Sequence, residues 1–110
     1  MSSRRGPQRE RAVRDWLLER DWVVVRAAGS LGEVDLVALK AGQRPRLIEV
    51  KSTAQGPYER FGPSDRADLN LRALWADADA FLAWWPPRGT LRWIHSSEWP
   101  HTGSEEVAAA

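Results

Sequence analysis

The chain has 110 residues, contains no cysteine and carries a formal net charge of +1. This length suffices for one domain with a single modest core, and without cysteine the chain forms neither disulfides nor thiolate zinc sites. The charge alone does not identify a nucleic-acid-binding protein, and the sequence shows neither an apolar run of roughly 20 residues nor a secretion signal, so we expect a cytoplasmic protein without membrane association.

Residues 7–21 are predicted to form a helix, because core-type side chains recur at helical spacing from Val13 to Arg20. Glu10 extends this stripe by one turn, so it is an acid at a core-facing edge. Two interpretations are open. One is an ion pair with Arg14, worth roughly 0.2–0.5 kcal/mol. The other is a further ligand for a metal ion or for its water.

Arginines are concentrated around Glu10. They are Arg4, Arg5, Arg9 and Arg11. Such a cluster is usually a solvated surface. Beside an acidic metal site it is better interpreted as a phosphate clamp, because carboxylates alone would repel DNA.

Three strands are expected next. Residues 22–26 are rich in β-branched side chains, and a glycine-containing loop follows at residues 27–32. Residues 32–39 and 47–51 are predicted to be antiparallel strands joined by a turn at residues 40–45.

The two antiparallel strands place three charged side chains on one face of the sheet. Side chains alternate along a strand, so Asp35 lies on one side of the first strand, and Glu49 and Lys51 share a side of the second. The expected opposite face of the first strand carries Val34, Leu36 and Ala38. The expected register pairs Leu39 with Leu47, Val37 with Glu49, and Asp35 with Lys51.

The apolar flanks of both strands indicate that these charges lie in the sheet core. Burying a carboxylate there costs several kcal/mol unless something compensates it. A divalent cation between Asp35 and Glu49 would compensate both carboxylates. The alternative is a plain ion pair of Lys51 with either acid on a solvated face.

A long loop follows at residues 52–62, and its length is typical of functional loops. Tyr58 and Phe61 either stack on nucleic-acid bases or pack beneath the loop, and packing is the more common fate. Arg60 is a candidate phosphate contact.

A second helix, capped by Ser64 or Asp65, is predicted to run to about residue 78. Its apolar stripe, which we expect to pack on the sheet, consists of Ala67, Leu71, Leu74, Trp75 and Ala78. The opposite side carries Arg66, Asp68, Asn70 and Arg72.

Two further strands, residues 79–85 and 91–95, complete the predicted domain of residues 1–100, and residues 101–110 are expected to be a disordered tail. Seven tryptophans are many for so small a core. Trp84, Trp85 and Trp93 are therefore candidates for a dimer interface, with ordinary core packing as the alternative. His95 and His101 lack metal-ligand spacing and are expected to be structural.

An aspartate followed, after a gap, by Glu-x-Lys between apolar flanks resembles the PD-(D/E)XK nuclease superfamily. The Ala-Gly-Ser run at 28–30, the Ile-Glu-Val-Lys-Ser run at 48–52 and the basic segment 5–11 with its early glutamate narrow the resemblance. Together they are similar to the archaeal-type Holliday junction resolvases, which also occur in phages, over about residues 4–99. Val34 stands where many members have proline or glycine, so Glu33 is a rival carboxylate. The stretch 32–38 also resembles a family of small nuclease-like bacterial proteins.

The resemblance implies a restriction-endonuclease-like α/β fold, with a mixed sheet flanked by helices in the order α-β-β-β-α-β-β. It implies Mg²⁺ or Mn²⁺ as the only cofactor, with no small-molecule cofactor. The implied metal ligands are Asp35, Glu49, the Val50 carbonyl and Glu10. Lys51 would stabilise the attacking hydroxide or the charge on the phosphate, and Ser30 would contact the phosphate at the catalytic site.

The implied function is the resolution of four-way junctions in branched DNA by paired incisions of a homodimer, in the host cytoplasm if the chain is phage-encoded. The implied DNA contacts are Arg4, Arg5, Arg9, Arg11, Ser30 and Arg60. Two alternatives stay open. One is a less selective nicking or repair nuclease on the same scaffold, and the other is a non-catalytic module that binds branched DNA.

Overall fold

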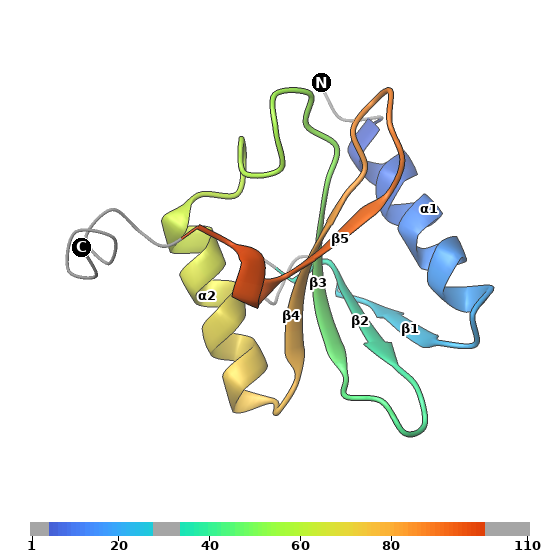
Figure 1. Cartoon of the computed structure of the whole chain (residues 1–110). Helices are drawn as coiled ribbons and strands as arrows, with labels where there is room; N and C mark the ends of the chain where they lie inside the picture. Colours follow the sequence, from blue (N-terminus) through green and yellow to red (C-terminus); the bar gives the residue numbers. More distant parts are fainter. Residues whose placement is uncertain (1–4, 28–33, 101–110) are drawn as a thin grey trace.

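The computed structural model describes residues 5–27 and 34–100. The elements in chain order are α1 (Arg5–Leu18), β1 (Val23–Arg26), β2 (Leu36–Leu39), β3 (Arg46–Lys51), α2 (Pro63–Trp75), β4 (Asp79–Trp84), β5 (Arg92–His95) and a short 3-10 turn, η1 (Ser96–Glu98). The predicted order α-β-β-β-α-β-β is confirmed (Figure 1). The predicted tail lies outside the described residues.

The five strands form one mixed sheet, and their order in space is their order along the chain. Neighbouring strands are antiparallel except β3 and β4, which run parallel. A parallel pair requires a crossover connection, and α2 supplies it. Helix α1 covers one face of the sheet and α2 the other (Figure 1). Among the described residues, no helix is long and apolar enough to cross a bilayer.

Two hydrophobic clusters fill the space between the sheet and its helices. On the α1 side, Val13 and Leu17 are fully buried in one cluster with Leu36 of β2. On the α2 side, Leu69 is fully buried in the other cluster with Leu82 of β4. The central strands contribute to both clusters because alternate side chains of a strand point to opposite faces.

The predicted register between β2 and β3 is wrong by two residues. The observed partners are Leu36 with Ile48, Val37 with Leu47, and Ala38 with Arg46. In this register Leu39 would face Pro45, which has no N–H group to extend the ladder. The ladder therefore ends one residue pair before it, at Ala38 and Arg46. A shift of two residues keeps the side chains of the paired residues on their expected faces, so the charged side chains still converge.

Two predicted boundaries are corrected. Helix α1 starts at Arg5 and ends at Leu18, before Asp21, which adopts a left-handed conformation with φ of 69°. Strand β2 starts only at Leu36, so strict alternation does not extend to Val34, whose side chain lies in the cluster on the α2 side.

Helix α2 presents a different face to the sheet from the one predicted. Its buried residues are Arg66, Leu69 and Ala73. Three residues of the predicted apolar stripe instead face outward, with Leu71 at 44%, Leu74 at 74% and Trp75 at 72% exposure, whereas Ala78, beyond the end of the helix, is buried as expected. Gly62, rather than Ser64 or Asp65, caps the helix. The helix face with Leu69 and Ala73 therefore packs on the sheet, and the apolar face with Leu71, Leu74 and Trp75 is left exposed.

Arg66 explains this choice of face. Its Nη1 group donates to the carbonyl oxygen of Phe61 at 2.7 Å, and its guanidinium lies over the Tyr58 ring at 5.3 Å. Phe61 is fully buried, and Tyr58 packs against the same cluster, as the packing interpretation expected. A buried guanidinium thus joins the start of α2 to the 52–62 loop.

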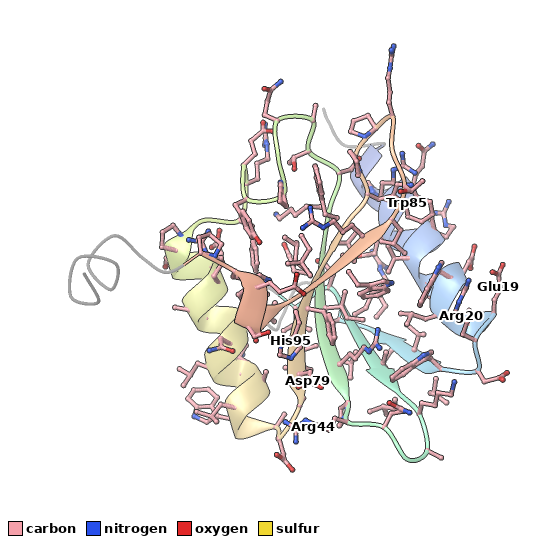
Figure 2. All side chains as sticks on the ribbon, viewed as in Figure 1. Glu19, Arg20, Arg44, Asp79, Trp85 and His95 are labelled. Atoms are coloured by element: carbon pink, nitrogen blue, oxygen red, sulfur yellow. The ribbon has the colours of Figure 1, made fainter. Side chains whose placement is uncertain are left out.

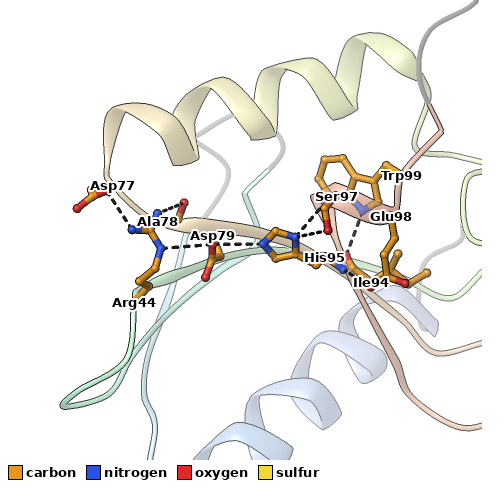
Figure 3. A network of polar contacts seen from close by, with 9 residues as sticks. All are labelled: Arg44, Asp77, Ala78, Asp79, Ile94, His95, Ser97, Glu98 and Trp99. Atoms are coloured by element: carbon orange, nitrogen blue, oxygen red, sulfur yellow. Dashed lines mark hydrogen bonds and ion pairs between the residues drawn. The ribbon is translucent and has the colours of Figure 1, made fainter. Parts of the chain in front are cut away.

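A polar network fastens the end of the sheet at which β4 begins (Figure 3). Asp79 accepts from Arg44 Nε at 3.4 Å and lies 3.2 Å from His95 Nε2. Because the Ser97 N–H donates to His95 Nδ1, the proton of the neutral imidazole is on Nε2 and points to Asp79. His95 thus has the structural role that was expected, and His101 lies outside the described residues.

We predict that replacing Arg66 with methionine lowers the free energy of unfolding by about 1–3 kcal/mol, because the buried Phe61 carbonyl loses its donor. Arg72→Met is the matched control on the same helix, since Arg72 pairs with Asp68 at the surface. The control should cost less than about 0.5 kcal/mol. Urea unfolding measures both variants, and equal stabilities would contradict the role assigned to Arg66.

Candidate active site

Strand β2 begins and β3 ends at the same end of the sheet (Figure 1). Three predicted catalytic side chains lie near one another there. Glu49 and Lys51 lie on the same face of β3, two residues apart. Glu49 is only 4% exposed because β3 has a strand on each side. Asp35 precedes β2, and the observed register, continued by one residue, places it opposite Glu49 rather than opposite Lys51.

Main-chain hydrogen bonds fix Asp35 against β3. Its N–H donates to the carbonyl of Ile48 at 2.8 Å, and its Oδ2 accepts from the N–H of Val50 at 2.8 Å. The carboxylate therefore takes the place of a main-chain acceptor at the end of the ladder. This contact holds Asp35 beside Glu49 without any contribution from a loop.

Glu49 has one paired and one unpaired oxygen. Oε2 lies 3.0 Å from the Lys51 ammonium. Oε1 is buried and no donor group of the described residues reaches it, while the Asp35 carboxyl lies within hydrogen-bond reach of the Glu49 side chain. A buried carboxyl oxygen that lacks a partner is unfavourable, so this atom marks a position suited to an added ligand.

Burial and the nearby Asp35 charge raise the pKa of Glu49 to about 9, despite the opposing effect of Lys51. Burial also raises the pKa of Asp35, although the hydrogen bond from Val50 opposes this shift. Two adjacent carboxyls that resist ionisation together are typical of sites that hold a proton or a cation between them.

The residues present fit a hard divalent cation. Asp35 and Glu49 offer carboxylate oxygens, which Mg²⁺ and Mn²⁺ prefer. Across residues 5–27 and 34–100, no group of three or more acidic, histidine or cysteine side chains is arranged to hold a metal. Mg²⁺ commonly uses one or two carboxylates together with water and substrate phosphate, so two acids suffice.

Glu10 forms an ion pair, but not with the residue that was expected. Its Oε1 accepts from Arg26 Nε at 2.9 Å, so the ion pair is with Arg26 of β1 and not with Arg14. The Glu10 charge also contributes to the raised pKa of Asp35. Sequence reasoning missed Arg26, because only the tertiary fold brings β1 beside the start of α1.

The proposed DNA contacts have different surroundings. Arg11 and Arg60 are exposed. Arg9 turns inward and donates to the carbonyl oxygens of Pro86 at 3.1 Å and Pro87 at 3.3 Å. Arg5 is described only as part of the α1 backbone. The predictions for Arg4, Ser30 and Glu33 lie outside the described residues.

The three tryptophans proposed for a dimer interface pack against the core. Trp85 and Trp93 lie against the cluster on the α1 side, and Trp84 against the other. The Trp84 indole also donates to the carbonyl oxygen of Thr53 at 2.9 Å. Trp84 is thus a site residue that the sequence did not identify, since it holds the chain just after Lys51.

We predict that, in the presence of a chelator, the melting temperature falls as the pH rises from about 5 to about 9. In this range the folded protein keeps on Glu49 a proton that the unfolded chain releases, so stability decreases toward the pKa of about 9. Glu49→Gln, which cannot ionise, should remove most of this decrease. A wild-type profile that is flat, or that the variant shares, would contradict this origin.

Comparison with known proteins agrees with the observed fold. A solved structure of Archaeoglobus fulgidus Hjc, a Holliday junction resolvase from an archaeal hyperthermophile, has a TM-score of 0.77 and 24% sequence identity, and the alignment covers 89% of this chain and 83% of that one. At this identity the likeness supports the fold. None of the curated proteins compared with the chain matches it.

The sequence model of the family described as archaeal Holliday junction resolvase (Hjc) matches residues 1–108. The name of the family denotes nucleases of DNA recombination and repair. Because the match extends over almost the whole sequence and the fold agrees, the chain belongs to the archaeal Holliday junction resolvase family.

Proposed function

We propose that the chain is an endonuclease, dependent on Mg²⁺ or Mn²⁺, that resolves four-way DNA junctions as a homodimer. The observation that supports it best is the buried Glu49 carboxyl, which faces Asp35 and Lys51 and has one oxygen without a partner. Membership of the resolvase family supports the choice of substrate.

The ion would be held by Asp35, Glu49 and the Val50 carbonyl, with Glu10 acting directly or through water. When bound, it supplies Lewis acidity to the scissile phosphate and lowers the pKa of a water molecule. Binding would replace the proton that Glu49 holds near neutral pH and would give its Oε1 a partner. The raised pKa of the pair thus favours an added positive charge.

Lys51 would stabilise the charge that develops on the phosphate. The Lys51 ammonium lies 3.0 Å from Glu49 Oε2, and this contact fixes it at the site. The ammonium is a compact hydrogen-bond donor, which suits a contact with the phosphate. Trp84 supports this arrangement, since it fixes Thr53 two residues beyond Lys51. Arg11 and Arg60, with Arg4, Arg5 and Ser30, would contact the DNA backbone.

We predict that Glu49→Gln abolishes cleavage of a labelled four-way junction while junction binding is kept. The amide preserves the shape of the side chain but cannot hold the cation. In a thermal melt, Mg²⁺ should raise the melting temperature of the wild type more than that of the variant.

Glu19→Gln is the matched control, because it removes one carboxylate at the far end of α1, where Glu19 is exposed (Figure 2). It should cleave like the wild type. Flaps and linear duplex are assayed in parallel. Equal cleavage of all three substrates would favour the less selective nuclease, and cleavage by Glu49→Gln at the wild-type rate would overturn the site.

The exposed apolar face of α2 supports the dimer. Leu71, Leu74 and Trp75 lie together on the outer side of the helix, away from the buried Leu69 and Ala73. Two matched incisions require two active sites, and a closed two-fold dimer uses the same surface of both copies. A single helix face of this kind is self-complementary, so we assign it to the contact with a second copy.

We predict that Leu71→Glu shifts the protein from dimer to monomer in equilibrium sedimentation at micromolar concentration, because the interface would bury two like charges. Gln43→Glu, in the exposed turn after β2, introduces the same charge elsewhere and should remain dimeric. Paired incision of the junction should fall in the Leu71 variant, with nicked product accumulating. A Leu71→Glu dimer as stable as the wild type would place the interface on another surface.

A further inference from the structure

The turn between β4 and β5 begins at the active site. The Trp85 N–H donates to the carbonyl oxygen of Lys51 at 2.9 Å, so the chain leaves the sheet directly beside the catalytic lysine. The turn then passes through Pro86, Pro87, Arg88 and Gly89 before β5 returns. In Figure 1 it projects past the start of α1 at this end of the sheet.

This turn is held in place more firmly than most exposed turns. Arg9 donates to two of its carbonyl oxygens, those of Pro86 and Pro87, and its guanidinium lies 4.9 Å from the Trp85 ring centroid. The Trp85 indole donates to the carbonyl of Gly89 at 3.1 Å, and the Gly89 N–H donates to that of Pro86 at 3.2 Å. The turn therefore has one shape before any partner arrives.

Gly89 is required by this shape. A Cβ atom at this position would lie 2.6 Å from Cγ of Pro86, and a proline ring cannot move aside as a flexible side chain can. Arg88, beside Gly89, is exposed, and no ion pair involving it occurs within the described part of the chain. A rigid support thus presents one arginine to solvent.

The pairing of the other charges near the site indicates a function for Arg88. Arg26 is paired with the Glu10 carboxylate, so this cation is largely neutralised, and the Lys51 ammonium is directed at the Glu49 carboxyl. Arg9 has carbonyls and a ring as partners, so its positive charge remains at the base of the turn. An acidic site that cuts a polyanion needs cations close by that are not already paired.

We propose that the turn of residues 86–90 is a preformed DNA-contact element, in which Arg88 binds a backbone phosphate near the scissile one and Arg9 holds the turn in position. This inference rests on the proposed function. At about 3.3 Å per extended residue, the four steps from Trp84 to Arg88 span at most roughly 13 Å. Phosphates follow about every 3.4 Å along the axis of one strand, so this reach covers only a few nucleotides.

Arg88→Gln tests the contact. In a chelator, to prevent cleavage, the variant should bind a four-way junction about tenfold more weakly. The slope of log K against log salt should decrease by about 0.9 per subunit, which is the value of one lost phosphate contact. Arg20→Gln is the matched control, because Arg20 lies at the other end of α1 from Trp85 (Figure 2). It should bind like the wild type.

Arg9→Lys tests the support. Lysine keeps the charge but lacks the planar guanidinium whose Nη2 group donates to both carbonyl oxygens and which lies over the Trp85 ring, so affinity should fall while the salt slope stays at the wild-type value. Gly89→Ala should act in the same way by deforming the turn. A slope reduced by a full contact in Arg9→Lys would overturn the positioning role of Arg9.

The outcomes for the turn and for the function are distinguishable. Junction binding by Arg88→Gln equal to that of Arg20→Gln would overturn the contact, even if the wild type cuts junctions normally. A wild type that neither binds nor cuts a junction would instead overturn the proposed function. Arg88→Gln should melt within a degree or two of the wild type, since its side chain is exposed.

Discussion

The burial of the Glu49 carboxyl is the constraint on which the rest of the molecule depends. A central strand flanked on both sides excludes water from this group, and Asp35 is held against it by main-chain hydrogen bonds. The lysine two residues along the strand compensates only part of the cost, because one oxygen is left without a partner. The sheet thus maintains a locally unfavourable arrangement, which a bound cation would relieve, and the two helix-covered faces supply the stability that permits it.

Arginine has a structural as well as an electrostatic role in this chain. Arg9 and Arg66 both turn inward and satisfy main-chain carbonyl groups, and Arg44 fastens the far end of the sheet through Asp77 and Asp79. The guanidinium suits this use because its several donors lie in one plane. The number of arginines available to contact DNA is therefore smaller than the composition suggests. Each arginine that has no protein partner accordingly contributes a larger share of any DNA binding.

The sequence identified the element order and the converging acids, because period-two alternation survives a register shift of two residues. It did not identify the register itself, because a shift of two residues leaves the same strand side chains on the same faces of the sheet. The buried face of α2 was mistaken, since a buried arginine looks like a surface residue until its acceptor, the Phe61 carbonyl, is known. Likewise, the partner of Glu10 is on β1, 16 residues away, and local spacing favoured Arg14 instead.

The parallel pairing of β3 with β4 has a consequence for when the chemistry becomes available. The β2–β3 hairpin is local and can form early, but β4 reaches β3 only after the whole of α2 has crossed the sheet. Such non-local pairing forms slowly, because the entropic cost of closing the loop arises before the stabilising contacts form. Until β4 arrives, Glu49 stays hydrated and ionises as an ordinary acid. A chain still emerging from the ribosome would therefore lack the buried carboxyl pair until β4 has been synthesised and has paired with β3.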